Sequence, residues 1–155
     1  MLYLSIKLLH ILSGAVLFGT GMGIAFFMVW ANRSRDPATI AAVARIVVVA
    51  DMIFTATAVL IQPLSGLWLV QIQGYSLTEP WLVVAYGLYG LTGAFWLPVI
   101  WIQLRLARLA EAAAAAGAPL AQDYERLYRI WFAMGFPAFA AVIGIYVMMV
   151  FKPAF

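Results

Sequence analysis

The residues best able to do chemistry are ionisable and polar side chains inside long apolar runs. Charge is costly in hydrocarbon, so such residues mark functional sites by default. The chain has one histidine, His10, which follows Lys7 by three positions in the first apolar run. Imidazole is a common ligand of haem iron and of metal ions, and a nearby ammonium group can pair with a haem propionate. The first run therefore predicts a haem-binding or metal-binding position at His10.

These residues also have a structural interpretation. A neutral histidine can bridge two membrane helices through a hydrogen bond, and a lysine near a helix start can extend to the headgroups. Asp51 lies in the second apolar run. We interpret it as a structural hydrogen-bond or ion-pair partner, with Arg45 or a loop arginine as its partner, in preference to a proton relay.

Composition identifies lipid as the solvent. Of the 155 residues, 66% are hydrophobic and 10% are charged, whereas soluble domains carry about 25% charged residues. A spanning helix needs about 20 apolar residues, so four spans and their connections account for the whole length. The absence of cysteine excludes disulfides, iron–sulfur clusters and thiolate metal sites. The basic residues form no dense cluster interleaved with aromatics, so nucleic-acid binding is not expected.

Capping signals divide the chain into helices. Asp36 followed by Pro37 is typical of a helix start, as is Pro80, and Gly117 with Pro119 ends a helix. The expected fold is all-α: an antiparallel bundle of four transmembrane helices in a single domain, 1–155. The expected helices cover residues 2–30, 37–72, 80–116 and 123–151.

The arginines predict the orientation. Seven of them belong to the first and third connections: Arg33, Arg35, Arg45, Arg105, Arg108, Arg126 and Arg129. The opposite side has Lys7 and Lys152. Cytoplasmic loops carry the excess of positive charge, so both termini are expected on the periplasmic side of a bacterial inner membrane.

Helical periodicity gathers the candidate residues. On the first helix, His10 shares a face with Lys7, Gly14 and Gly21. With a rise of about 1.5 Å per residue, antiparallel helices bring similar depths together, while Asp51 belongs to the opposite half of the membrane. The predicted cluster in the periplasmic half contains Lys7, His10, Gln62, Ser65, Tyr86, Tyr89 and Tyr146, with Met148 and Met149 close by.

Several stretches resemble a known superfamily. They are 7–14 (KLLHILSG), 18–25 (FGTGMGIA), 62–66 (QPLSG), 79–82 (EPWL) and 151–153 (FKP). The chain resembles the superfamily that groups HemJ-type protoporphyrinogen oxidases with CopD-type copper-resistance membrane proteins. Within it, the chain is most similar to an uncharacterised family of predicted integral membrane proteins of unknown function.

The resemblance implies chemistry for particular residues. In HemJ-type enzymes the first-helix histidine is taken to bind haem b, a role that would fall on His10. Those enzymes also depend on a lysine in a later helix, but no lysine occurs here between Lys7 and Lys152. This departure argues against protoporphyrinogen oxidation. The CopD-type members imply copper handling, with His10, Met148 and Met149 as candidate Cu(I) ligands.

Three hypotheses follow. The leading one is a redox membrane protein that binds haem b through His10, with a quinone or another redox partner; as an enzyme it would be a haem-dependent oxidoreductase. The second is a copper or small-solute carrier. The third is a non-enzymatic scaffold or subunit, self-associating through the small residues of the first helix. In the first hypothesis Lys7 lies near a propionate, Gly14 and Gly21 make room for the macrocycle, and Gln62, Tyr86 and Tyr89 line the pocket.

Overall fold

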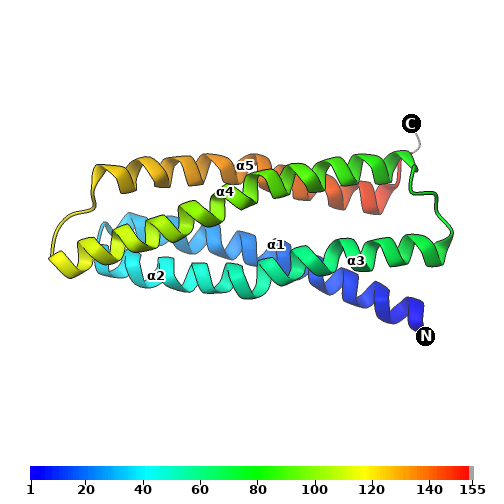
Figure 1. Ribbon diagram of the computed structural model, residues 1–155, viewed down its shortest axis with the longest axis horizontal. Coiled ribbons are helices and arrows are strands. Elements are labelled where there is room, and N and C mark those ends of the chain that lie inside the picture. The colour runs from blue at the N-terminus through cyan, green and yellow to red at the C-terminus, as the bar shows by residue number, and fades with distance from the viewer. Residues whose placement is uncertain (154–155) are drawn as a thin grey trace.

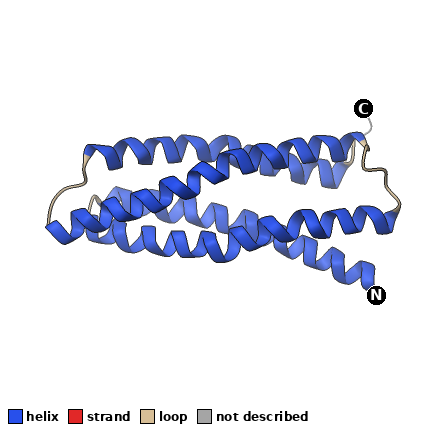
Figure 2. Cartoon of the chain, in the orientation of Figure 1, coloured by secondary structure: helices blue, strands red, loops and turns tan. Residues whose placement is uncertain are grey.

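The computed structural model describes residues 1–153, and the described chain is almost entirely helical (Figure 2). The last two residues of the expected domain, 154 and 155, lie outside the described residues. The helices are α1 (Leu2–Ser34), α2 (Pro37–Ala50), a π-helical turn η1 (Asp51–Thr55), α3 (Ala56–Gln73), α4 (Pro80–Ala116) and α5 (Gln122–Phe151). Because α2, η1 and α3 run on without a break, the chain makes four long apolar crossings, as predicted.

Local chemistry sets the helix limits at the expected places. Asp36 caps α2 by accepting hydrogen bonds from the backbone nitrogens of Ala38, at 3.3 Å, and Thr39, at 2.9 Å. The Thr39 hydroxyl and backbone N–H also hold the pKa of the Asp36 carboxyl below its ordinary value. Gly74 and Gly117 end α3 and α4 with φ of 68° and 60°, a conformation that favours glycine. The signals at Asp36 and Gly117 are confirmed.

The first helix runs four residues beyond its predicted end at residue 30. The polar side chains expected to stop it bond back to their own helix: Asn32 Nδ2 donates to the Met28 carbonyl and Ser34 Oγ to the Ala31 carbonyl. Arg35 then ends the helix in the left-handed region with φ of 55°. Polar side chains that satisfy helical carbonyls therefore extended α1 where a loop was expected.

The four crossings form an elongated antiparallel bundle made of two helix pairs (Figure 1). One pair is α4 with α5, and the other is α1 with the crossing formed by α2, η1 and α3. In the half that contains α2, the pairs meet through α2 and α4. In the other half α3 comes close to neither α4 nor α5 along most of its length, and the two pairs diverge. Large apolar side chains such as Leu64 and Val150 are about 70% exposed (69% and 72%), as expected for helices that face lipid.

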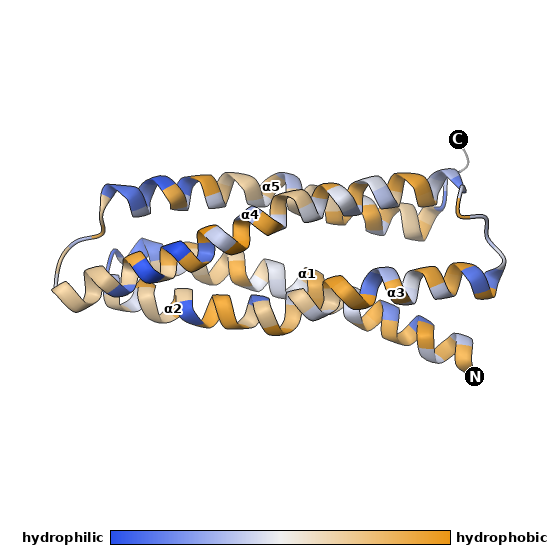
Figure 3. Cartoon of the chain, viewed as in Figure 1, coloured by the Kyte–Doolittle hydropathy of each residue, from blue (hydrophilic) through white to orange (hydrophobic). Residues whose placement is uncertain are grey.

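The main apolar core lies in the half where the pairs meet. Its buried members include Met28 of α1, Ile40 of α2, Leu106 of α4 and Tyr124 of α5. At this end Tyr124 donates a hydrogen bond from its hydroxyl to Asn32 Oδ1, at 2.9 Å. Hydrophilic residues gather at the same end of the bundle (Figure 3). The buried core holds the four helices together at this end. In the diverging half the two helix pairs pack less closely, and the polar residues of the predicted cluster lie there.

Candidate functional site

The His10 side chain of α1 faces α3 and contacts Ser65 there. The imidazole Nδ1 lies 2.9 Å from Ser65 Oγ, and Ser65 itself is only 4% exposed. The ring lies against Gly66: a Cβ added there would lie 3.1 Å from His10 Cε1. Gly66 therefore lets the imidazole lie directly against the backbone of α3.

The hydrogen bonds of Ser65 determine the tautomer of His10. Ser65 Oγ lies 2.6 Å from the Ile61 carbonyl oxygen of its own helix. Two oxygens at that distance repel unless a hydrogen lies between them, so the single hydroxyl hydrogen goes to Ile61. Ser65 Oγ must then accept from His10, which places the imidazole hydrogen on Nδ1. We assign this tautomer from the network, and it leaves an unprotonated lone pair on Nε2.

A second set of bonds clamps the backbone of α1 to α3. Gln62 Nε2 donates to the His10 carbonyl oxygen and to Ser13 Oγ, both at 2.8 Å. Ser13 Oγ in turn donates to the His10 carbonyl, at 3.1 Å. The side chain of Gln62 thus fixes the turn of α1 that carries His10.

Gly14 is the point where α1 meets two other helices. A Cβ at Gly14 would lie 2.9 Å from Gln62 Nε2 of α3 and 3.0 Å from the Tyr146 hydroxyl of α5. The space beside Gly14 is therefore occupied by these two side chains. Gly21, one of the other glycines on this face, has the Phe139 ring 3.9 Å from its notional Cβ.

The two predicted tyrosines of α4 differ in environment. Tyr89 donates its hydroxyl hydrogen to the Val59 carbonyl. Proline has no backbone N–H, and Val59 lies four residues before Pro63, so Tyr89 satisfies the carbonyl that Pro63 leaves without its helical donor. Tyr86, three residues earlier, is 40% exposed.

The remaining predicted site residues lie toward the chain termini. Lys7 is exposed, and its Nζ lies 5.6 Å from the ring centroid of Tyr3. Met148 and Met149 are partly buried near the end of α5, where Met149 packs against the buried cluster of Val70, Trp81 and Leu82. The structure thus brings His10, Gln62, Ser65 and Tyr146 together, as the depth argument predicted, while Lys7 is turned toward Tyr3.

Asp51 forms a separate polar position, as predicted. Its Oδ1 accepts a hydrogen bond from Trp96 Nε1 of α4, at 3.3 Å. The expectation that Arg45 or a loop arginine pairs with Asp51 is wrong for Arg45. The Arg45 Nη2 instead lies 2.9 Å from Glu111 Oε1, because Arg45 points to the exposed surface between α2 and α4 while Asp51 is buried.

Sequence reasoning missed three contributors to these positions. Ser13 follows His10 by three residues, a spacing that places both on one helical face. Gly66 stands directly after Ser65, and a glycine beside a polar helix position is a signal for close approach. Trp96 follows Tyr89 by seven residues, a spacing that places both on one helical face, but no pattern in the sequence indicates which residue its indole contacts.

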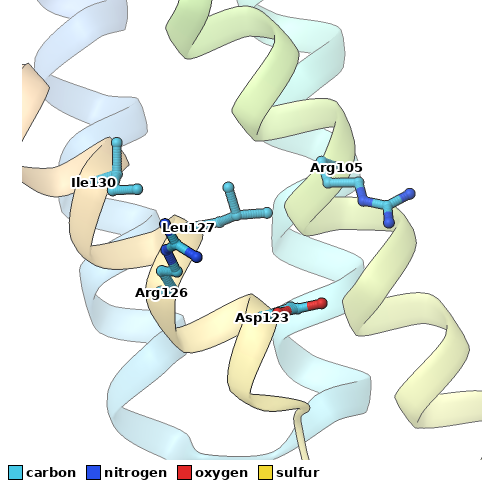
Figure 4. A pocket seen from close by; sticks show the side chains of 5 residues that line it. All are labelled: Arg105, Asp123, Arg126, Leu127 and Ile130. Atoms are coloured by element: carbon cyan, nitrogen blue, oxygen red, sulfur yellow. The ribbon is translucent and has the colours of Figure 1, made fainter.

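The opposite end of the bundle carries a basic surface. A pocket of about 220 Å³ lies between α4 and α5, lined by Arg105, Asp123, Arg126, Leu127 and Ile130 (Figure 4). A second one of about 470 Å³ is lined by residues that include Asn32, Arg35 and Tyr128. Both belong to the end where the arginines gather.

The residues around His10 limit which metals the protein itself can hold. Within residues 1–153, no group of three or more His, Asp or Glu side chains comes together as a metal cage. A zinc or calcium ion needs several protein ligands. Haem is different, because the porphyrin supplies four nitrogens and the protein need supply as few as one axial ligand.

Fold and composition define the chain as a four-span α-helical integral membrane protein. A family model, described as "Predicted integral membrane protein (DUF2269)", matches residues 4–153. The chain belongs to this family, whose function is unknown, and the expectation of an uncharacterised membrane family is confirmed. Among curated proteins and solved structures, nothing matches the chain.

The clamp around Gly14 leads to a stability prediction. In Gly14→Ala the new Cβ displaces the Gln62 amide and breaks its two hydrogen bonds, each worth about 0.5–1.5 kcal/mol. We expect unfolding in detergent micelles at a lower temperature, with a loss of about 1–3 kcal/mol before the gain in helix propensity, which is under about 1 kcal/mol. Gly19→Ala is the matched control, since nothing lies within 4 Å of that position. Equal melting temperatures for the two variants would contradict the clamp.

Proposed function

We propose that the protein binds haem b in the diverging half of the bundle, with His10 Nε2 as the axial ligand. The observation that supports this most is the hydrogen-bond chain from His10 to Ser65 to Ile61, which leaves the Nε2 lone pair free. Histidines that bind metals usually donate their other ring hydrogen to a fixed acceptor, which sets the ring orientation and raises ligand basicity. Ser65 is such an acceptor for His10.

The surroundings of His10 support a macrocycle in two further ways. In this half, α3 packs closely against neither α4 nor α5 along most of its length, and the proposed macrocycle would lie between these helices. Tyr86 and Tyr89 of α4 and Gln62 of α3 would then border it. Lys7, one turn from His10 toward the chain start, would pair with a propionate after leaving Tyr3.

Haem b, when bound, would supply one-electron chemistry. The chain's own residues would contribute three things to that chemistry. His10 would set the ligation, Ser65 would hold the imidazole in one orientation, and the apolar side chains around them would limit the access of water. We infer a redox or electron-transfer role in the membrane on this basis.

An optical spectrum tests the proposal. Protein purified after expression with adequate haem is expected to show a Soret band, and His10→Ala is expected to lose it. Ser65→Ala keeps the ligand but removes its acceptor, so haem affinity should fall about 10- to 100-fold. Ser13→Ala is the matched control, because Ser13 bonds the backbone of His10 and not its ring.

Two results would refute haem binding through His10. One is the absence of a Soret band in the haem-loaded wild type, and the other is an unchanged band in His10→Ala. If His10→Ala lowers only the melting temperature and no variant has a spectrum, then the bond from His10 to Ser65 serves helix packing. The protein would then be the non-enzymatic subunit or scaffold of the third hypothesis.

We also infer the orientation from the arginines. The seven arginines expected in the first and third connections belong to the end where α1 meets α2 and α4 meets α5, the hydrophilic end in Figure 3. The positive-inside rule places this end in the cytoplasm. Both termini, and the His10 site with them, would then belong to the periplasmic half of a bacterial inner membrane.

The absence of cysteine makes the orientation directly testable. Single cysteines at the exposed positions Ser76 and Ala116 report the two ends of the bundle. In intact cells, a membrane-impermeant maleimide should label Ser76→Cys, whereas Ala116→Cys should react only after the cells are disrupted. The reverse pattern would place the termini in the cytoplasm.

A further inference from the structure

A second polar position lies far from His10, in the π-helical turn η1. Asp51 opens this turn and Thr55 closes it, and their side chains are only 3% and 7% exposed. Asp51 precedes Ser65 by fourteen residues on one continuous crossing, which at 1.5 Å per residue is roughly 21 Å. The position is therefore separate from the haem site proposed above.

The hydrogen bonding of this position is incomplete. Trp96 Nε1 donates to Asp51 Oδ1. In the described part of the chain, Asp51 Oδ2 and Thr55 Oγ1 are both buried and have no hydrogen-bond partner. A buried polar atom without a partner costs about 1–3 kcal/mol, and more when it is charged. The side chains of Asp51 and Thr55 are within interaction range of each other, so these two oxygens can complete each other's hydrogen bonding.

Within residues 1–153, no side-chain cation is paired with the Asp51 carboxylate. Its neighbour on the same crossing, Arg45, is ion-paired with Glu111 at the surface. On the other three helices no titratable side chain occurs between His10 and Arg33, between Tyr89 and Arg105, or between Arg129 and Tyr146. The level of the bundle occupied by Asp51 therefore contains no second ionisable group among residues 1–153.

The backbone at Asp51 is itself unusual. The Ala56 N–H bonds to the Asp51 carbonyl, five residues back, where an α-helix would use four. Single π-turns inside α-helices occur frequently at functional sites. Here the π-turn begins and ends at the two residues whose side chains have unpartnered oxygens, which links the backbone irregularity to the polar position.

We propose that Asp51 is a proton-binding site within the membrane, with Thr55 and Trp96 as the groups that accommodate its two protonation states. In the protonated state, the acid hydrogen on Oδ2 donates to a neighbouring oxygen, for which Thr55 Oγ1 is available. In the ionised state, Trp96 Nε1 stabilises the carboxylate through Oδ1. At neutral pH the proton stays bound, because the neutral acid is the form compatible with buried surroundings that lack a cation.

Infrared spectroscopy tests this directly, because a protonated carboxylic acid and a carboxylate have different stretching bands. The other acidic side chains are Asp36, Glu79, Glu111, Asp123 and Glu125, and none of them is buried. We expect a carboxylic-acid band in the folded wild type at neutral pH, its absence in Asp51→Asn, and its loss at high pH.

The Trp96→Phe variant tests whether Trp96 affects the pH at which the carboxylic-acid band disappears, an effect that a purely structural role would not produce. Removing the donor to Oδ1 disfavours the carboxylate, so the acid band should persist to higher pH than in the wild type. Trp101→Phe is the matched control, since Trp101 lies on the same helix and is 62% exposed. It should leave the titration unchanged.

Three results would overturn the proposal. The first is a wild-type spectrum with only carboxylate bands at neutral pH, which needs no variant to interpret. The second is an acid band that is unchanged in folded Asp51→Asn. The third is loss of the band when Na⁺ is added at constant pH, since the position would then take a metal cation.

Discussion

The bilayer interior offers no water, and this constraint organises the whole structure. Every polar group in the spans must find its partner within the protein. At the proline in α3 the partner is a side chain from another helix: Tyr89 donates to the carbonyl that Pro63 leaves free. At His10 the same rule produces the chain of bonds to Ser65, Gln62 and Ser13. At Asp51, the carboxyl oxygen Oδ2 and the Thr55 hydroxyl oxygen have no assigned hydrogen-bond partner among residues 1–153.

The two polar positions therefore differ in kind. At His10 the ring Nδ1 bonds to Ser65, and the backbone carbonyl accepts from Gln62 and Ser13. The Nε2 lone pair is the donor that the proposed ligand would use. At Asp51 a carboxyl oxygen and a hydroxyl remain unpartnered in a level of the bundle without a countercharge. The first arrangement fits the proposed haem ligand, which needs one well-oriented donor atom. The second fits the proposed binding of a proton. Asp51 and Ser65, the partner of His10, are separated along one continuous crossing, so the two proposed sites do not share residues.

Much of the fold could be predicted because its signals are local or periodic. Four long apolar runs, the cap at Asp36, the start at Pro80 and the end at Gly117 define the crossings. Depth along antiparallel helices also brought His10, Gln62 and Ser65 together correctly. The extension of α1 to Ser34 was missed, because side-chain bonds to helical carbonyls compete with the loop signal of the same residues. The π-turn at Asp51 and the partner of Trp96 depend on packing between helices, which a single sequence does not encode in any local pattern.

The hydrogen bond to Ser65 Oγ fixes His10 in the tautomer with hydrogen on Nδ1 and a lone pair on Nε2. Because the chain has one histidine, nitrogen NMR of protein labelled only at histidine gives one pair of imidazole signals without an assignment problem. The haem-free protein in lipid at neutral pH should show a protonated Nδ1 and an unprotonated Nε2. Ser65→Ala should lose that preference. A hydrogen on Nε2 in the wild type would mean that Ser65 donates to the ring, which would contradict the proposed basis for metal ligation.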